Sequence, residues 1–169
     1  MFFSHRLSLT GILLTKNVWD NYWSHYESEI SVDYLIRKDP FYRLLKKMMP
    51  LDSRETLNVL EIGCGSGART LALVKDFKSL LINAVLIDSS LEAIAFAKKN
   101  AKRNKIKANF ILADAFNLPL TSNFDIVWNE GVNEHFWNEN RQLIFQKMAS
   151  VCNVRFGNRS GSKYIEPTL

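Results

Sequence analysis

From Leu57 onward, short apolar runs alternate along the chain with amphipathic stretches. Apolar runs of this length are typical of buried strands, and apolar positions three or four residues apart are typical of helices. The pattern predicts strands at residues 57–62, 84–87, 109–113 and 124–128, and helices at residues 68–77, 91–104 and 139–151. Strands separated by helices indicate parallel βαβ units. We therefore expect an α/β fold whose mostly parallel, doubly wound sheet carries helices on both faces.

Residues 1–50 form a segment of different character, which we interpret as an N-terminal helical cap. Residues 17–29 predict a helix with Trp19, Tyr22, Trp23 and Tyr26 on one stripe. This stripe fits either a docking face against the domain or a flap over a ligand pocket. Residues 33–49 predict a second helix, interrupted at Pro40. The core then covers residues 51–152, and residues 153–169 show no regular period and predict an irregular tail.

Composition narrows the class of protein. The chain has 169 residues, of which 47% are hydrophobic and 23% charged, which excludes a disordered or fibrous protein. We expect no membrane segment, because every apolar run is shorter than the roughly 18–20 residues that a span requires. Two cysteines are too few for a disulfide framework and fit a cytoplasmic location.

The formal net charge of +5 is uneven along the chain. Six lysines and arginines lie between residues 98 and 107, where they fit either the solvated end of a helix or a nucleic-acid patch. Aromatic residues do not interleave with them, so a nucleic-acid partner is possible but not favoured.

The segment LNVLEIGCGSG at residues 57–67 carries the clearest chemical signal. A predicted strand runs into a glycine loop that opens a predicted helix, and ligands bind at this end of parallel strands. Gly63, Gly65 and Ala68 satisfy the dinucleotide pattern G-x-G-x-x-G/A, which keeps an NAD-dependent oxidoreductase open. However, Glu61 precedes the first glycine, where a carboxylate would repel a pyrophosphate but hold the ammonium group of an amino-acid ligand.

With Gly67, this loop resembles the glycine-rich signature of class I S-adenosylmethionine-dependent methyltransferases, which have a Rossmann-like fold. The resemblance continues in order over about residues 17–151. It implies that Asp88 binds the ribose hydroxyls, that Asp114 and Ala115 lie beside the adenine, and that Asn129 and Glu130 line the space between cofactor and acceptor. The expected cofactor-binding set is Glu61, Gly63, Cys64, Gly65, Gly67, Asp88, Ser89, Asp114, Ala115, Asn129 and Glu130.

The expected reaction is transfer of the sulfonium methyl group of S-adenosylmethionine to an acceptor, for which we favour a small molecule. A general base is needed only where the acceptor must lose a proton, and the candidates are Glu130, Glu134 and His135. Cys64 could be a nucleophile, but its place in a loop shaped for backbone contact indicates that its thiol takes no part in the reaction. No metal site is expected, because the three histidines lack ligand spacing.

The chain departs from the family pattern after the fourth predicted strand, because members usually continue into a fifth strand and an antiparallel hairpin. An open fourth strand would expose unpaired backbone groups, so we expect a second subunit or the tail to cover it. A truncated or frameshifted gene is one interpretation. It leaves a non-catalytic cofactor-binding remnant or partner subunit as the alternative to an active enzyme.

Overall fold

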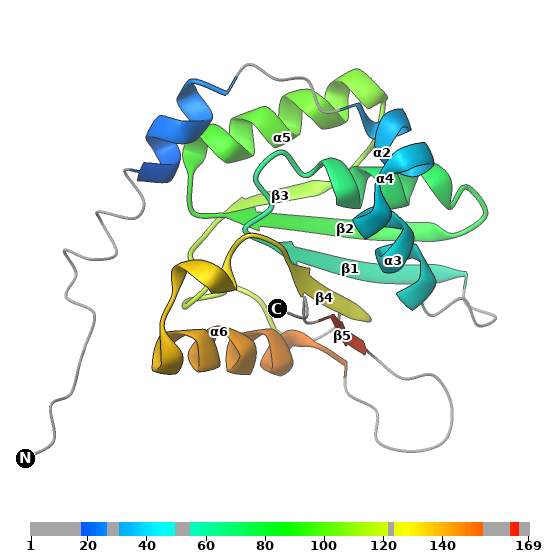
Figure 1. Ribbon diagram of the computed structural model, residues 1–169. Coiled ribbons are helices and arrows are strands. Elements are labelled where there is room, and N and C mark those ends of the chain that lie inside the picture. Colours follow the sequence, from blue (N-terminus) through cyan, green and yellow to red (C-terminus); the bar gives the residue numbers. More distant parts are fainter. Residues whose placement is uncertain (1–17, 27–30, 50–54, 122–123, 154–162, 166–169) are drawn as a thin grey trace, which may run out of the picture.

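The computed structural model describes residues 18–26, 31–49, 55–121, 124–153 and 163–165 (Figure 1). Its centre is a five-stranded sheet in the order β3-β2-β1-β4-β5, in which all neighbouring strands are parallel. The strands are β1 (Thr56–Ile62), β2 (Leu81–Asp88), β3 (Asn109–Leu112), β4 (Ile126–Asn129) and β5 (Lys163–Ile165). The predicted parallel α/β architecture is confirmed.

The two central strands are buried on both faces, as their apolar sequences require. Along β1, Leu57 and Val59 belong to the core on one face, whereas Leu60 and Ile62 belong to the core on the other. β1 pairs with β2 from Thr56↔Leu81 to Ile62↔Ile87. The two strands therefore end side by side, which brings Glu61 and Asp88 to the same edge of the sheet.

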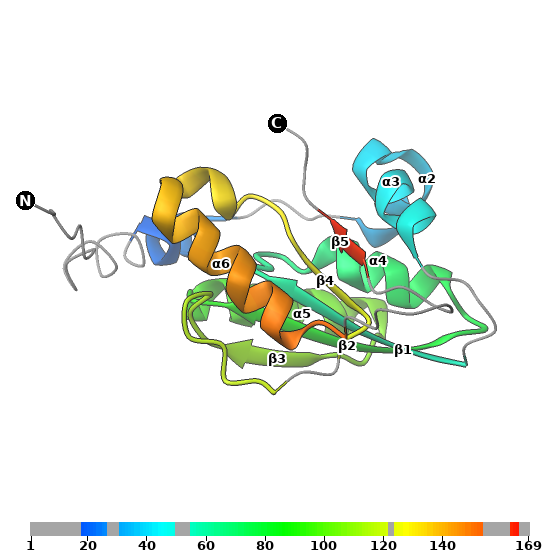
Figure 2. The same cartoon turned by 90° about the horizontal axis from the view of Figure 1, so that it is seen from below.

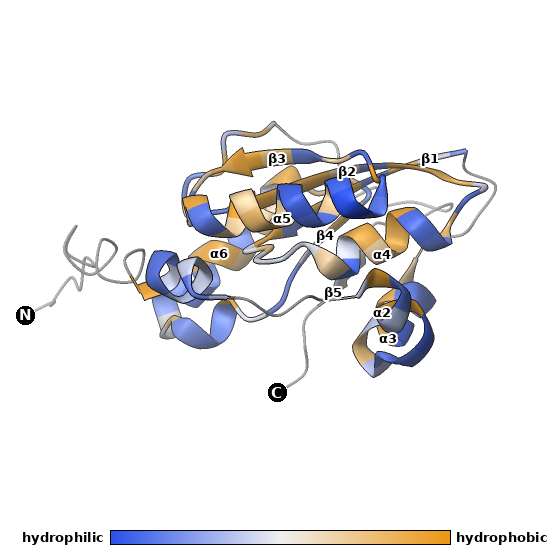
Figure 3. Cartoon of the chain, turned by 90° about the horizontal axis from the view of Figure 1, so that it is seen from above, coloured by the Kyte–Doolittle hydropathy of each residue, from blue (hydrophilic) through white to orange (hydrophobic). Residues whose placement is uncertain are grey.

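Helices cover both faces. α4 (Ala68–Asp76) and α5 (Leu91–Asn104) contribute to the core on one face, and α6 (Asn138–Val151) packs on the other through Ile144, Met148 and Val151. Figure 2 shows α6 crossing the strands on this second face. In Figure 3, α5 presents a long hydrophilic stretch, whereas most of β2 is hydrophobic. The basic residues of α5 are solvent-exposed, as expected for a solvated helix face.

The predicted helix over residues 33–49 is two helices, α2 (Val32–Lys38) and α3 (Pro40–Met48). Asp39 lies between them, and its side chain accepts a hydrogen bond from the backbone N–H of Phe41 (3.1 Å). Pro40 occupies the first turn of α3, where a missing N–H is harmless. α2 and α3 pack with α4 on the same face of the sheet. Of the predicted aromatic helix, residues 18–24 are helical, while residues 27–30 lie outside the described residues.

The tail corrects one expectation. Residues 153–169 do not lack regular structure throughout, because Lys163–Ile165 forms β5 and pairs with β4 from Ile126↔Lys163 to Trp128↔Ile165. The edge of β4 is therefore covered by the chain itself (Figures 1 and 2), so it supplies no reason to expect a second subunit there. The periodicity of the sequence missed this strand because three residues are too few to show an alternation.

No helix within the described part of the chain has the length and apolarity needed to cross a membrane.

Candidate functional site

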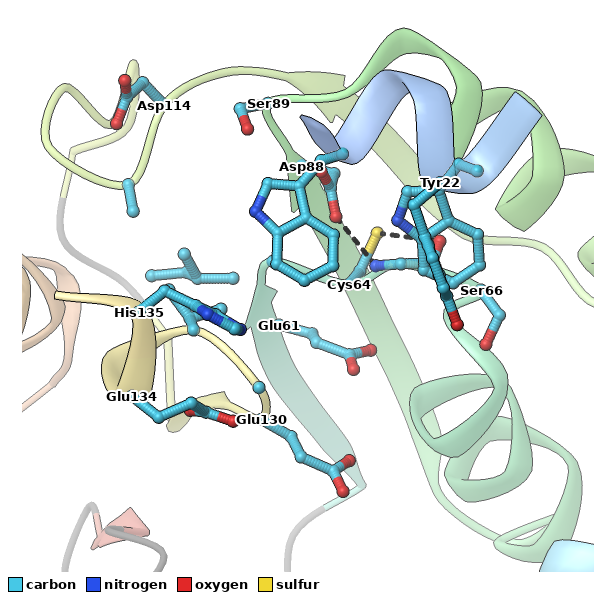
Figure 4. Close-up of a pocket in the computed structure, with 18 of the residues that line it drawn as sticks. Tyr22, Glu61, Cys64, Ser66, Asp88, Ser89, Asp114, Glu130, Glu134 and His135 are labelled. Carbon is cyan, nitrogen blue, oxygen red and sulfur yellow. Dashed lines mark hydrogen bonds between the residues drawn. The ribbon is translucent and has the colours of Figure 1, made fainter. Parts of the chain in front are cut away.

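A cavity of about 790 Å³ lies at the carboxyl end of the sheet. Its lining comes from the ends of β1, β2 and β3, from the residues that follow β4, from the first turn of α4, from the 3₁₀ helix η1 (Asn133–His135) and from residues 19–26. Figure 4 shows the side chains around it. The topology thus places one pocket where the four predicted segments after β1, β2, β3 and β4 converge, at the position where parallel sheets bind ligands.

The glycine loop forms the floor of this cavity. Gly65 has a φ of +49°, a left-handed conformation that a side chain disfavours, and a Cβ there would lie 2.4 Å from Cζ2 of Trp23. Gly67, with a φ of +64°, precedes α4 at its N-cap. The loop therefore presents bare backbone to the cavity and directs the start of a helix towards it.

Asp88 ties the end of β2 to this loop. Its carboxylate accepts hydrogen bonds from the backbone N–H groups of Gly65 (2.8 Å) and Ser90 (2.9 Å), and its side chain is buried (Figure 4). Burial raises the pKa of Asp88, and the backbone hydrogen bonds oppose that rise. The backbone N–H of Ser89 also favours the charged form of Asp88. A carboxylate has about four acceptor positions, so Asp88 can still accept a hydrogen bond from a ligand.

Glu61 is the most unusual group in the cavity. Only 5% of Glu61 is exposed, and its Oε2 makes no hydrogen bond of good geometry to the described residues. The hydroxyl of Thr70, which also lacks such a partner, lies beside it and acts to lower the pKa of Glu61. Burial raises the pKa of Glu61 to about 8 from an ordinary value of 4.5. An unpaired buried carboxylate is costly for the fold, and a ligand that places a positively charged donor against Oε2 would remove that cost.

The end of β4 contributes Asn129 and Glu130. Asn129 is buried, and its Nδ2 donates a hydrogen bond to Sδ of Met148 (3.0 Å), so its side chain faces α6. It does not line the cavity, in contrast to the expected cofactor role. Glu130 does line the cavity and forms an ion pair with Arg69. Burial nevertheless raises the pKa of Glu130.

Glu134 and His135 lie on η1 at the mouth of the cavity, and both are exposed. The ring of Trp19 meets His135 edge-on, with 4.9 Å between the ring centres. The three residues predicted as candidate bases therefore surround one side of the cavity, although only Glu130 is partly buried (Figure 4).

Gly63, Cys64, Ser89, Asp114 and Ala115 also line the cavity, but Gly67, which was expected to bind the cofactor, does not, because its open side faces Leu86 in the core. Asp114 follows β3, and its carboxylate accepts a hydrogen bond from the N–H of Phe116 (2.8 Å), which shapes the turn that carries Ala115. Ser89 follows Asp88 directly. Cys64 is buried, and burial raises the pKa of its thiol well above the ordinary value, so it has the properties of an inert thiol rather than a nucleophile.

The aromatic helix at residues 18–24 extends across the mouth of the cavity. At one end Trp23 packs against Phe96 of α5, with 5.8 Å between ring centres, and at the other end Trp19 packs against His135. Trp19, Tyr22, Trp23 and Tyr26 all line the cavity. The stripe predicted from the sequence therefore docks on the domain and covers the pocket at the same time.

Sequence reasoning missed Arg69 and Asp39. Arg69 lies in the first turn of α4, and its Nε donates to Asp39 (2.8 Å) while its guanidinium pairs with Glu130. This network links α3 to the end of β4. A signal was present, because a cation in the first turn of a helix opposes the helix dipole and requires nearby acids.

Within the described residues, no cluster of three or more histidine, cysteine, aspartate or glutamate side chains is arranged to hold a metal ion.

Comparisons with known proteins agree on one family. A family described as a methyltransferase domain matches residues 59–154. The release factor glutamine methyltransferase of Pasteurella multocida is 36% identical over 42% of this chain and 26% of its own length. That of Lactococcus lactis is 29% identical over 62% of this chain and 39% of its own length. The chain thus spans between about a quarter and two fifths of these relatives.

Solved structures show the same fold. The PH0226 protein of Pyrococcus horikoshii aligns with a TM-score of 0.62 at 25% identity, over 78% of this chain and 60% of that chain. Magnesium protoporphyrin IX methyltransferase of Synechocystis, solved with bound S-adenosylmethionine, aligns with a TM-score of 0.63 at 15% identity, over 88% of this chain and 74% of that chain.

Proposed function

This chain belongs to the family of methyltransferase domains, and we propose that it binds S-adenosylmethionine at the glycine loop and transfers its methyl group to an acceptor in the same cavity. When bound, the cofactor supplies a methyl group already activated by a sulfonium sulfur. The protein's own contribution is placement, because proximity and alignment alone lower such a barrier by up to about 7–11 kcal/mol.

The observation that carries this proposal is the buried carboxyl of Glu61, which lines the glycine-loop cavity and has only the uncharged hydroxyl of Thr70 as a side-chain donor beside its unsatisfied Oε2. An α-ammonium group would supply the charged donor that this oxygen lacks. Apart from Glu61, the lining holds four carboxyl groups and one guanidinium: Asp88, Asp114, Glu130, Glu134 and Arg69. Such a surface favours a cationic cofactor and repels the pyrophosphate of a dinucleotide, which argues against the NAD-dependent alternative.

The family resemblance suggests how the other residues act. Asp88 would accept hydrogen bonds from the ribose hydroxyls, with Ser89 beside it, while Asp114 and Ala115 would lie against the adenine. Gly63 and Gly65, which line the cavity, would let the backbone approach the cofactor closely, whereas Gly67 would act by letting the loop pack against Leu86. Asn129 faces Met148, so we propose that it supports the end of β4 rather than contacting the cofactor.

For proton transfer we favour Glu130 over Glu134 and His135. Glu130 lines the cavity and is partly buried, whereas Glu134 and His135 are exposed. A base works best when its pKa lies near the working pH, and burial raises the pKa of Glu130 in that direction. Arg69 pairs with Glu130 and would hold its carboxylate in place.

Calorimetric titration tests the cofactor assignment. We expect S-adenosylmethionine and S-adenosylhomocysteine to bind and NAD⁺ to give no heat. Binding of NAD⁺ without binding of either sulfur compound would overturn the proposal. The variant Asp88→Ala should lose affinity, whereas Glu139→Gln, an exposed residue outside the cavity, serves as a matched control. Cofactor binding without methyl transfer to any acceptor would support the non-catalytic alternative.

The printed names of the curated relatives give different acceptors. They include a release factor glutamine methyltransferase, a ribosomal protein L11 methyltransferase and a ubiquinone biosynthesis O-methyltransferase. We propose a small-molecule acceptor because the aromatic helix covers the mouth of the cavity, and because a volume of about 790 Å³ suits small ligands.

A further inference from the structure

We propose that the methyl acceptor is a small organic amine that enters as its ammonium ion and is held by carboxylates and aromatic rings at the β4 side of the cavity. This inference rests on the proposed function. We call the region that holds the amine the acceptor face, and define it as Trp19, Glu130, Glu134, His135 and Phe136, all of which line the cavity.

Two acidic side chains of the cavity, Glu130 and Glu134, lie outside the part that the cofactor is expected to contact. Glu130 and Glu134 lie at the end of β4 and on η1, away from the ends of β2 and β3, where the ribose and adenine are expected (Figure 4). The charge of Glu130 contributes to the raised pKa of Glu61, and the charge of Glu134 contributes to the raised pKa of Glu130. Acidic side chains therefore run from Glu61 on the buried floor to Glu134 at the mouth.

Arg69 does not neutralise this row. Its guanidinium already donates to Asp39 and pairs with Glu130, and it also lies over the ring of Phe41, 5.0 Å from the centre. With two acids on one cation, the Arg69 network retains a net negative charge. An acceptor with a carboxylate or a phosphate would meet repulsion here, whereas an ammonium ion would be attracted.

Aromatic rings complete the acceptor face. Trp19 meets His135 edge-on, and Phe136 meets Phe116 edge-on with 5.0 Å between the ring centres. The cation–π contacts found in the described part of the chain involve Phe77 and Phe41, so neither uses a ring of the acceptor face. Aromatic faces combined with carboxylates form the usual environment for organic ammonium ligands.

The same arrangement provides a route for the proton. An ammonium nitrogen has no lone pair, so it must first lose its proton, which we assign to the carboxylate of Glu130. The nitrogen lone pair of the neutral amine then forms the new carbon–nitrogen bond, while the electron pair of the breaking carbon–sulfur bond remains on sulfur. The nitrogen ends with the positive charge, and the acceptor face stabilises it.

A matched pair of probes tests the charge recognition. Choline and 3,3-dimethylbutan-1-ol have nearly the same shape, but only choline is charged. With the protein saturated with S-adenosylhomocysteine, we expect choline to bind at least about tenfold more tightly, as one cation–π or ion contact predicts. Equal binding, or tighter binding of the neutral alcohol, would overturn the amine assignment.

Variants of the acceptor face locate the effect. Glu134→Gln should lower choline affinity by about threefold or more while leaving the affinity for 3,3-dimethylbutan-1-ol unchanged, and Trp19→Leu should lower choline affinity more than the affinity for the alcohol. Glu134 is exposed, so its variant is expected to fold even if Trp19→Leu does not. Glu139→Gln removes an identical charge from α6, outside the cavity, and should leave choline binding unchanged. Equal losses in Glu139→Gln and Glu134→Gln would refute the assigned site.

The two proposals can fail separately. If S-adenosylhomocysteine does not bind, the proposed function fails. If it binds and choline shows no advantage over its neutral counterpart, only the amine assignment fails.

Discussion

The substitution Glu61→Gln removes the charge from the most deeply buried carboxylate of the cavity while keeping its shape. In the folded protein burial raises the pKa of Glu61 to about 8, whereas in the unfolded chain the carboxyl has its ordinary value of 4.5. The folded state therefore holds the proton more tightly. The contribution of protonated Glu61 to the free energy of unfolding is fully present below pH 4.5 and is lost as the pH rises towards 8. A glutamine side chain does not ionise, so the stability of the Glu61→Gln variant does not fall with pH for this reason.

The size of the effect follows from the two pKa values. A difference of one pKa unit between the folded and unfolded states corresponds to about 1.4 kcal/mol. The shift of Glu61 from 4.5 to about 8 therefore lowers the free energy of unfolding of the wild-type protein by about 4–5 kcal/mol between low pH and pH values above 8. Between pH 5.5 and 8.5, the free energy of unfolding of Glu61→Gln should therefore gain about 3 kcal/mol relative to wild type. An uncharged amide also has its own constant cost in a buried site, so the change with pH is the informative quantity.

Urea unfolding followed by tryptophan fluorescence at pH 5.5, 7.0 and 8.5 measures this change. The matched control is Glu55→Gln, which removes a carboxylate from an exposed position before β1 and should follow the wild-type pH dependence. A difference between Glu61→Gln and wild type that stays constant with pH, or that shrinks as the pH rises, would refute the reasoning.

Four further substitutions test other parts of the site. Asp88→Ala removes the expected ribose contact and should weaken S-adenosylhomocysteine binding by roughly tenfold or more in calorimetry; unchanged affinity would show that the ribose lies elsewhere. Gly65→Ala places a Cβ 2.4 Å from Trp23 in a left-handed conformation and should destabilise the fold by about 1–3 kcal/mol in thermal unfolding. Trp23→Ala in the same background should recover part of that loss, and no recovery would mean that the ring is not the obstacle. Asp39→Ala removes a helix cap and one partner of Arg69 and should cost about 1–3 kcal/mol in urea unfolding; a change within error would contradict the network.

The elements of the fold were predictable where the capping residues, the apolar pattern and the proline positions of a segment all favour the same structure. The helix predicted over residues 91–104 has the same bounds as α5 in the structure, because Ser90 caps its start and an apolar stripe runs along it. The break at Pro40 was predictable because proline fits only the first turn of a helix. By contrast, β2 begins at Leu81 rather than at residue 84, because pairing with β1 extends it through Asn83, a residue with little strand preference of its own.

The site was predictable as a set of segments but not as a network. The strand ends that carry Glu61 and Asp88 had to meet once the sheet was parallel. Nothing local to Arg69 shows that its partners are Asp39, 30 residues earlier, and Glu130, 61 residues later. The direction of a side chain was equally hidden, since Asn129 turns towards Met148 on α6 instead of into the cavity.

The helix across the mouth of the cavity has a kinetic consequence. The glycine loop and Asp88 form the floor, while Trp19 and His135 meet at the rim. A ligand on the floor lies beneath the place where a second ligand enters, so we expect compulsory-order kinetics in which the cofactor binds first and its spent form leaves last. A dead-end analogue of the acceptor should then inhibit uncompetitively with respect to S-adenosylmethionine, and S-adenosylhomocysteine should inhibit competitively.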